Sequence, residues 1–269
     1  EQQEEISLAL MHVHHYSDVL GMNMDMDVII PEMSRGQIGQ RAKDTQGKLP
    51  VLYLLHGMSD DHTIWQRRTS IERYATEAGF AVVMPTTHLG FYTDMYRGPK
   101  WFTYITQELP HLVPRMFPQV STQWEDTYVA GLSMGGYGAL KCTLRAPHVF
   151  CCGAALSAAT DIVQRYEGYR HGEQYLTDVF GPREHIEGSF NDLFAAAEDL
   201  AGQHEDLPGI FMWCGTEDFL YDENVRMRDH LLLLGYDLTY EESPGDHQWM
   251  YWDEQIQTVL QWLLAGRGQ

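Results

Sequence analysis

The segment "VAGLSMGGYGAL" (residues 129–140) decides the fold, because it places a Gly-x-Ser-x-Gly motif between two different secondary-structure patterns. The apolar run "TYVAG" before Ser133 is typical of a buried strand, and "GGYGALKCTLRA" after it is typical of a helix that ends near Pro147. In a strand–turn–helix context the central serine lies on a sharp turn, with its hydroxyl clear of the sheet. Gly131 and Gly135 leave room for that turn. The context therefore predicts that Ser133 is a nucleophile.

Glycine-rich turns also bind phosphate groups, and this alternative has to be weighed. The glycines around Ser133 are not followed by Lys-Ser or Lys-Thr, and the chain contains no Gly-x-Gly-x-x-Gly. A phosphate-binding loop is therefore disfavoured.

Short apolar runs alternate with helical patterns along the whole chain. Runs that are typical of parallel strands covered on both faces occur at 51–55, 80–85, 127–131, 151–156 and 210–214. The segments between them show helical spacing, as in 71–78, which ends at Gly79, and 227–234, which ends at Gly235. This alternation predicts an α/β fold with a mostly parallel central sheet flanked by helices.

The first predicted strands differ from the later ones. Segment 22–30, "MNMDMDVII", alternates with period two, which indicates a half-buried antiparallel strand at one edge of the sheet. The residues expected to face the core are Met22, Met24, Met26 and Val28, and those expected to face water are Asn23, Asp25 and Asp27.

One segment is too long for an ordinary connection. Residues 161–205 separate two core strands and carry several aromatic side chains before a helical stretch around Leu193–Leu200. We interpret them as a cap-like insertion over the carboxyl ends of the strands, within a single domain that spans residues 1–269.

A serine nucleophile needs a base and an orienting carboxylate, which should follow in the order serine, acid, histidine. After the strand at 210–214 the chain offers Glu217, Asp218 and Asp222. Asp218 is the expected acid; Asp222 is interpreted as a helix N-cap, and Glu217 is the reserve. His247 lies in the loop between the last strand and the last helix and is the expected base, whereas His230 lies within a helix.

The developing oxyanion needs two hydrogen-bond donors. The expected donors are the backbone N–H groups of Met134, after the nucleophile, and of Met58, in the loop after "VLYLLHG". His56 is interpreted as a structural residue of that loop. Four aromatic residues follow core strands on the same side and are candidates for the substrate pocket: Trp65, Phe91, Tyr92 and Trp101.

Composition excludes several classes of partner. The formal net charge of −20 disfavours nucleic acid and anionic membranes, and no run is long and apolar enough to span a bilayer. The four cysteines include no Cys-x-x-Cys pair, which favours a reduced, cytoplasmic protein. The start lacks signal-peptide features, although it also lacks methionine, which leaves room for a removed leader.

Histidine-rich stretches raise the question of a metal. "HVHH" (12–15) and His62 beside Asp60 and Asp61 contain ligand-type side chains, but no His-Glu-x-x-His or comparable spacing occurs. We expect neither a metal nor a cofactor.

The segments "LLHGMSDDHTIW", "VAGLSMGGYGAL", "CGTEDFL" and "GDHQWMYW" together resemble the esterase D-like family of α/β-hydrolases, from about residue 8 to the end of the chain. This family includes S-formylglutathione hydrolases, mycolyltransferases, feruloyl esterases and short-chain tributyrin-type esterases, of which the last are the most similar. The resemblance implies the same nucleophile, acid and base as the residues above, and the same oxyanion donors. It also implies a metal-free, mostly cytoplasmic protein, a homo-oligomer among the possible assemblies, and small-molecule or carbohydrate esters as substrates.

The sequence thus predicts a serine carboxylesterase that works through an acyl-enzyme on short-chain esters, including acetyl or feruloyl esters of carbohydrates. Three alternatives stay open. They are a thioesterase for S-formylglutathione, an acyltransferase, and a non-catalytic binding module that keeps the fold.

Overall fold

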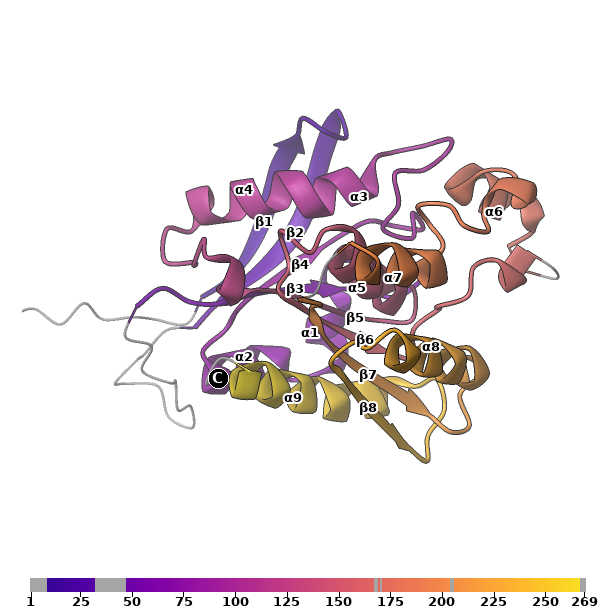
Figure 1. The fold of residues 1–269 in the computed structure, drawn as a ribbon. Helices are drawn as coiled ribbons and strands as arrows, with labels where there is room; N and C mark the ends of the chain where they lie inside the picture. Colours follow the sequence, from indigo (N-terminus) through magenta and orange to yellow (C-terminus); the bar gives the residue numbers. More distant parts are fainter. Residues whose placement is uncertain (1–8, 32–46, 167–168, 170, 204–205, 267–269) are drawn as a thin grey trace, which may run out of the picture.

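The computed structural model describes residues 9–31, 47–166, 169, 171–203 and 206–266; the acidic start of the chain lies outside these ranges. Eight strands form one sheet in the order β1-β2-β4-β3-β5-β6-β7-β8 (Figure 1). The strands are β1 Ala9–Ser17, β2 Met22–Ile30, β3 Val51–Leu55, β4 Ala81–Pro85, β5 Thr127–Leu132, β6 Cys152–Leu156, β7 Gly209–Gly215 and β8 Leu238–Ser243. Each apolar run singled out in the sequence forms one of these strands, within one or two residues.

Strands β3 to β8 run parallel to one another, whereas at one edge β2 pairs antiparallel with both β4 and β1. This antiparallel edge was predicted from the sequence, but the prediction that Asp27 faces water was wrong. That side chain is fully buried, because it points to the same face of the sheet as Ile29, which the helices at 64–68 and 71–78 cover. The Nδ1 of His12 lies 2.6 Å from Asp27 Oδ1.

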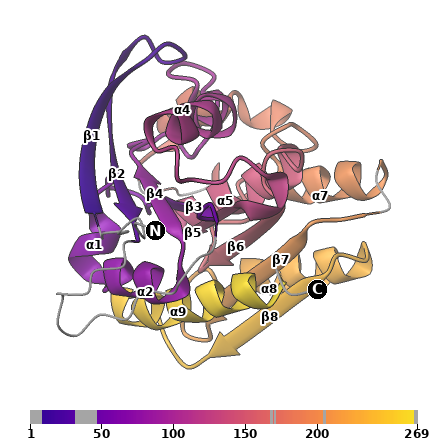
Figure 2. The ribbon, with the colours of Figure 1, turned by 90° about the vertical axis from the view of Figure 1, so that its left-hand side faces the viewer.

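Helices cover both faces of the sheet. They are α1 Ile64–Arg68, α2 Ile71–Ala78, α3 Trp101–Thr103, α4 Leu109–Met116, α5 Met134–Arg145, α6 Glu173–Phe180, α7 Leu193–Ala201, α8 Tyr221–Leu233 and α9 Trp249–Gly266. Helices α1, α2 and α9 bury their apolar side chains against one face. Helices α4, α5, α7 and α8 pack on the other face, so that the sheet lies between two hydrophobic layers (Figure 2).

The segment 161–205 divides into two parts, which differs from the expectation of one cap. Its last helix, α7, packs beside α5 on the sheet face and serves as the connection between β6 and β7 (Figures 1 and 2). Its first part, with α6, contacts the loop after β4: Tyr175 donates a hydrogen bond to Leu89 O, and Phe180 packs on Phe91. The long connection therefore contains an ordinary crossover helix as well as an insertion.

All four cysteines are free thiols, and Cys142, Cys151 and Cys214 are buried, as expected of small apolar side chains. None of the helices in the described ranges combines the length and the apolar character that a membrane crossing requires.

Candidate active site

Ser133 lies on a strained turn between β5 and α5. Its backbone has φ +54° and ψ −115°, a conformation that residues with side chains rarely adopt. Two glycines make the turn possible. A Cβ on Gly131 would lie 2.3 Å from Gly135 O, and a Cβ on Gly135 would lie 2.5 Å from Leu55 O. The turn predicted from the sequence is therefore present, and it sets Ser133 at the N-terminus of α5.

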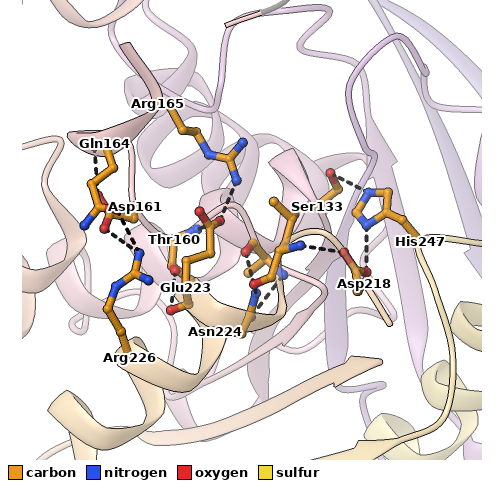
Figure 3. A network of polar contacts seen from close by, with 12 residues as sticks. Ser133, Thr160, Asp161, Gln164, Arg165, Asp218, Glu223, Asn224, Arg226 and His247 are labelled. Carbon is orange, nitrogen blue, oxygen red and sulfur yellow. Dashed lines mark hydrogen bonds and ion pairs between the residues drawn. The ribbon is translucent and has the colours of Figure 1, made fainter. Parts of the chain in front are cut away.

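The structure brings Ser133, His247 and Asp218 together from the ends of three different strands (Figure 3). Ser133 Oγ lies 3.1 Å from His247 Nε2, and His247 Nδ1 lies 2.8 Å from Asp218 Oδ2. A carboxylate can only accept a hydrogen bond, so the imidazole proton sits on Nδ1. His247 Nε2 is then free to accept the proton of the serine hydroxyl. This is the geometry that activates a serine.

Asp218 is kept ionised and fixed in place. Burial by itself would raise the pKa of this carboxyl, but the hydrogen bond and the charge of His247 outweigh it, and the pKa is lowered. The second oxygen, Oδ1, accepts a hydrogen bond from Leu220 N at 2.9 Å. The carboxylate therefore cannot rotate away from the imidazole.

The other acidic candidates have different roles. Glu217 is exposed and accepts a hydrogen bond from Gly245 N at 2.6 Å, two residues before His247, so it anchors the histidine loop. Asp222 was expected to cap a helix, but α8 begins at Tyr221 and Asp222 lies within its first turn. The helix start is held by Asp218 instead. His230 contacts Phe194 O and lies away from the site.

The two residues expected to supply the oxyanion donors are found in the wall of one cavity with Ser133. Met134 is the first residue of α5, so its N–H has no partner within the helix and lies at the positive end of the helix dipole. Met58 follows the end of β3, and both residues line the same cavity as Ser133. His56 fixes the loop that carries Met58, as expected of a structural residue: its Nδ1 contacts Gly57 O, and its Nε2 accepts a hydrogen bond from Thr87 N. Burial lowers the pKa of His56 to about 4, so it stays neutral.

A cavity of about 600 Å³ opens over Ser133. Most of the residues that line it are apolar or aromatic and few are charged, as is typical of small-molecule sites. The lining residues that matter below are Met58, Asp60, Phe91, Arg165, Tyr169, Phe219, Trp249 and Trp252.

Of the four aromatic residues expected in the pocket, only Phe91 lines this cavity. Trp65 is buried under β3 and donates a hydrogen bond to Leu55 O. Tyr92 is buried against Gly138, and Trp101 against Gly90. These three residues follow strand ends in the sequence, but their side chains turn into the core.

The aromatic side chains that line the cavity near the histidine were missed. The ring of Phe219 lies 4.6 Å from that of His247, and the ring of Trp252 lies 4.8 Å from it. A signal for them was available, because Phe219 follows Asp218 directly and Trp249 comes two residues after His247. Tyr169 and Arg165 come from the insertion, where the sequence has no periodic pattern that predicts which side chains face the cavity.

The histidine-rich stretches are engaged in pairwise contacts. His14 pairs with Asp25, and His62 contacts the hydroxyl of Thr86. Within the described ranges, no three side chains of the histidine, cysteine or acidic types are placed to share a metal ion.

A mostly parallel eight-stranded sheet with a strained serine turn after β5 defines the α/β-hydrolase fold. The family described as "Putative esterase" matches residues 17–263, and the chain belongs to this esterase family. An acetyl esterase of Caldicellulosiruptor saccharolyticus is 31% identical over 95% of this chain and 98% of its own length. The protein is thus an esterase of the serine hydrolase class.

Two solved structures from Staphylococcus aureus are similar over almost the whole chain. The fluorophosphonate-binding serine hydrolase FphF, in a substrate-bound form, has a TM-score of 0.84 and 31% identity over 96% of this chain and 98% of its own. The S-formylglutathione hydrolase FrmB has a TM-score of 0.83 and 31% identity over 96% of this chain and 99% of its own.

Proposed function

We propose that Ser133, His247 and Asp218 are a catalytic triad that hydrolyses short-chain carboxylic esters through an acyl-enzyme. The observation that carries the proposal is the chain of two hydrogen bonds, of 3.1 Å and 2.8 Å, that links the three side chains at the wall of the cavity. His247 takes the proton of the Ser133 hydroxyl as the oxygen attacks the ester carbonyl. Asp218 stabilises the imidazolium that forms.

The backbone N–H groups of Met58 and Met134 stabilise the negative charge on the carbonyl oxygen of the tetrahedral intermediate. His247 then gives its proton to the leaving alcohol, and the acyl group stays on Ser133. A water molecule, activated by His247 in the same way, attacks the acyl-enzyme and releases the acid.

Acetyl esters are the first substrate class to test, because the acetyl esterase relative matches nearly the whole chain. The cavity volume of about 600 Å³ accommodates a short acyl group together with a small alcohol. Acetyl or feruloyl esters of carbohydrates are larger carboxylic esters that the same triad could hydrolyse. A series of p-nitrophenyl esters of increasing acyl length measures the preference for acyl chain length.

The test of the mechanism is the variant Ser133→Ala. We expect kcat for p-nitrophenyl acetate to fall about 10⁴- to 10⁶-fold and labelling by a fluorophosphonate probe to disappear. The matched control is Ser70→Ala, an exposed serine between α1 and α2, which should keep both activities. Near-normal turnover by a folded Ser133→Ala variant would disprove the mechanism.

A second candidate is thioester hydrolysis, which the similarity to FrmB favours. The same triad cleaves a thioester, and only the leaving group differs. Comparison of kcat/KM for S-formylglutathione and for p-nitrophenyl acetate separates the two candidates, since the physiological class should show the higher value.

A further inference from the structure

Arg165 is the one lysine or arginine among the described residues that line the cavity. It comes from the short helix η3 (Gln164–Tyr166) in the insertion after β6, and only 16% of its side chain is exposed. Ester hydrolysis by a serine, a histidine and an aspartate does not require a guanidinium in the wall. A cationic group at this position therefore calls for a ligand or for a structural reason.

The structural contacts of Arg165 use only part of its hydrogen-bonding capacity. A guanidinium has five N–H donors. One terminal nitrogen, Nη2, lies 2.5 Å from Glu223 Oε1, whereas Nε is buried without a hydrogen-bond partner among the described residues. The contact with Glu223 thus engages one of the two terminal nitrogens, and an acceptor brought by a ligand in the cavity can bind to the remaining terminal N–H groups.

The ion pair of Arg165 and Glu223 is also fixed in place before a ligand binds. Glu223 accepts a hydrogen bond from Thr160 N at 2.9 Å, and its backbone carbonyl accepts one from the Thr160 hydroxyl at 3.0 Å. Figure 3 shows the neighbouring pair, in which Arg226 lies 2.8 Å from Asp161. Arg226 does not line the cavity, so the two arginines of one network differ in their access to substrate. Rigid placement lowers the entropic cost of binding a ligand.

Arg165 comes from the connection after β6, the strand next to β5, which precedes the nucleophile. Ser133 follows β5, Arg165 follows β6 and His247 follows β8, whereas Met58 follows β3 on the other side of β5. The leaving alcohol has to lie near His247, which protonates it, and the carbonyl oxygen near Met58. The loop of His247 reaches back toward the β3 side, since Trp249 packs on Trp65 of α1, and in Figure 3 Ser133 lies between Arg165 and His247. A carboxylate bound by Arg165 can therefore belong to the alcohol part or to the acyl part of the ester.

The acidic residue of the wall, Asp60, lies on the opposite side, in the loop after β3. Burial raises the pKa of this carboxyl to about 6, and the charges of Arg67 and Arg68 lower it only in part. Asp60 is thus mostly anionic at neutral pH, and an anionic substrate is best accommodated with its charge directed away from Asp60.

We propose that Arg165 binds a carboxylate carried by the substrate, so that this esterase prefers esters that bear a carboxylate near the ester bond. The inference rests on the proposed function, since it specifies the charge of the esters that Ser133 attacks. The group that Arg165 recognises is a carboxylate close to the ester bond of the substrate. Arg165 therefore determines substrate specificity.

The experiment uses matched pairs of esters that differ in one negative charge. For the alcohol side the pair is 4-acetoxybenzoate and its methyl ester. For the acyl side the pair is the mono-p-nitrophenyl ester of glutaric acid and p-nitrophenyl butyrate. The measured quantity is the ratio of kcat/KM for the anionic ester to that for the neutral ester, with KM and kcat recorded separately.

We expect Arg165→Met to lower this ratio about 10- to 100-fold for at least one of the two pairs, chiefly through a higher KM, because a charge-assisted hydrogen bond is lost. Arg165→Lys should restore part of the ratio. The matched control Arg226→Met should leave the ratio unchanged.

Removal of Arg165 leaves Glu223 buried without its cation, which can destabilise the fold. The double variant Arg165→Met/Glu223→Gln removes that problem and should show the same loss of ratio, whereas Glu223→Gln alone should keep the ratio or raise it. A loss confined to the acyl-side pair also supports recognition by Arg165 and assigns the carboxylate to the acid part.

Equal ratios for wild type and both Arg165→Met variants, in both pairs, would overturn the inference. Absence of hydrolysis of the neutral esters by the wild-type protein is a different result, because it would remove the proposed function itself.

Discussion

Lys141 is a fully buried cation in α5, and its charge should make stability depend on pH. Its Nζ donates hydrogen bonds to Thr93 Oγ1 and to Asn191 Oδ1, which are neutral groups, and aromatic rings lie 5.2–5.7 Å away. Burial lowers the pKa of this lysine from 10.5 to about 7. We predict that replacing it by methionine removes a pH-dependent part of the free energy of unfolding.

The sign and the size of the effect follow from linkage. Because the pKa is lower in the folded state, the unfolded chain binds more protons between pH 7 and pH 10.5, so stability rises with pH in that window. A shift of this size lowers the free energy of unfolding by a total of about 5 kcal/mol as the pH falls from above 10.5 to below 7. Of this loss, about 2 kcal/mol should be recovered when the pH rises from 7 to 9.

The assay is urea unfolding of the wild type and of Lys141→Met at pH 7 and pH 9. Taking the difference between the two proteins cancels the titration of the groups that they share. We expect the wild type to gain about 2 kcal/mol relative to the variant between these pH values. Lys100→Met, at an exposed position, is the control and should show no such gain. A wild-type-minus-variant difference that is constant with pH would refute the reasoning.

Three further predictions concern the site and its support. Asp218→Asn should lower kcat for p-nitrophenyl acetate about 10⁴-fold with the fold intact, because an amide can turn its NH₂ toward His247 and favour the wrong tautomer. Glu217→Gln should lower kcat/KM roughly tenfold, since the anchor of Gly245 is weakened and the histidine loop shifts. Gly135→Ala should destabilise the protein by about 3 kcal/mol or prevent folding, because its Cβ would lie 2.5 Å from Leu55 O.

Each of these has its own check. Circular dichroism establishes that the Asp218 variant is folded, and a loss below tenfold would argue against its orienting role. For Glu217 a change in kcat/KM without any change in fluorophosphonate labelling rate would contradict the loop argument. For Gly135 the unfolding midpoint decides, and an unchanged value would show that the turn tolerates a side chain.

The three residues of the proposed triad could be predicted because each signal is local. A serine turn, a carboxylate after a strand and a histidine before the last helix are visible in short segments, and parallel strands bring their carboxyl ends to one edge. The sheet and most of its helices were predictable for the same reason, since short apolar runs and helical spacing are local patterns.

The direction of a side chain was not predictable where tertiary packing decides it. Trp65, Tyr92 and Trp101 follow strand ends, but neighbouring helices and glycines accept them into the core. Asp27 follows the alternating pattern of a water-facing residue, yet helices α1 and α2 cover that face of the sheet. Arg165 comes from an insertion without a periodic pattern, so its place in the cavity wall could be seen only in the structure.

The distribution of the site over the loops after β5, β7 and β8 has a consequence for biosynthesis. A ribosome delivers the N-terminal part of a chain first, so the strained serine is made well before the strand that precedes its histidine. Until β8 has emerged and docked on β7, the nascent polypeptide holds a hydroxyl with no proton acceptor. Esterase activity should therefore appear only after β8 and the loop that carries His247 have been made, and it reports completion of the sheet.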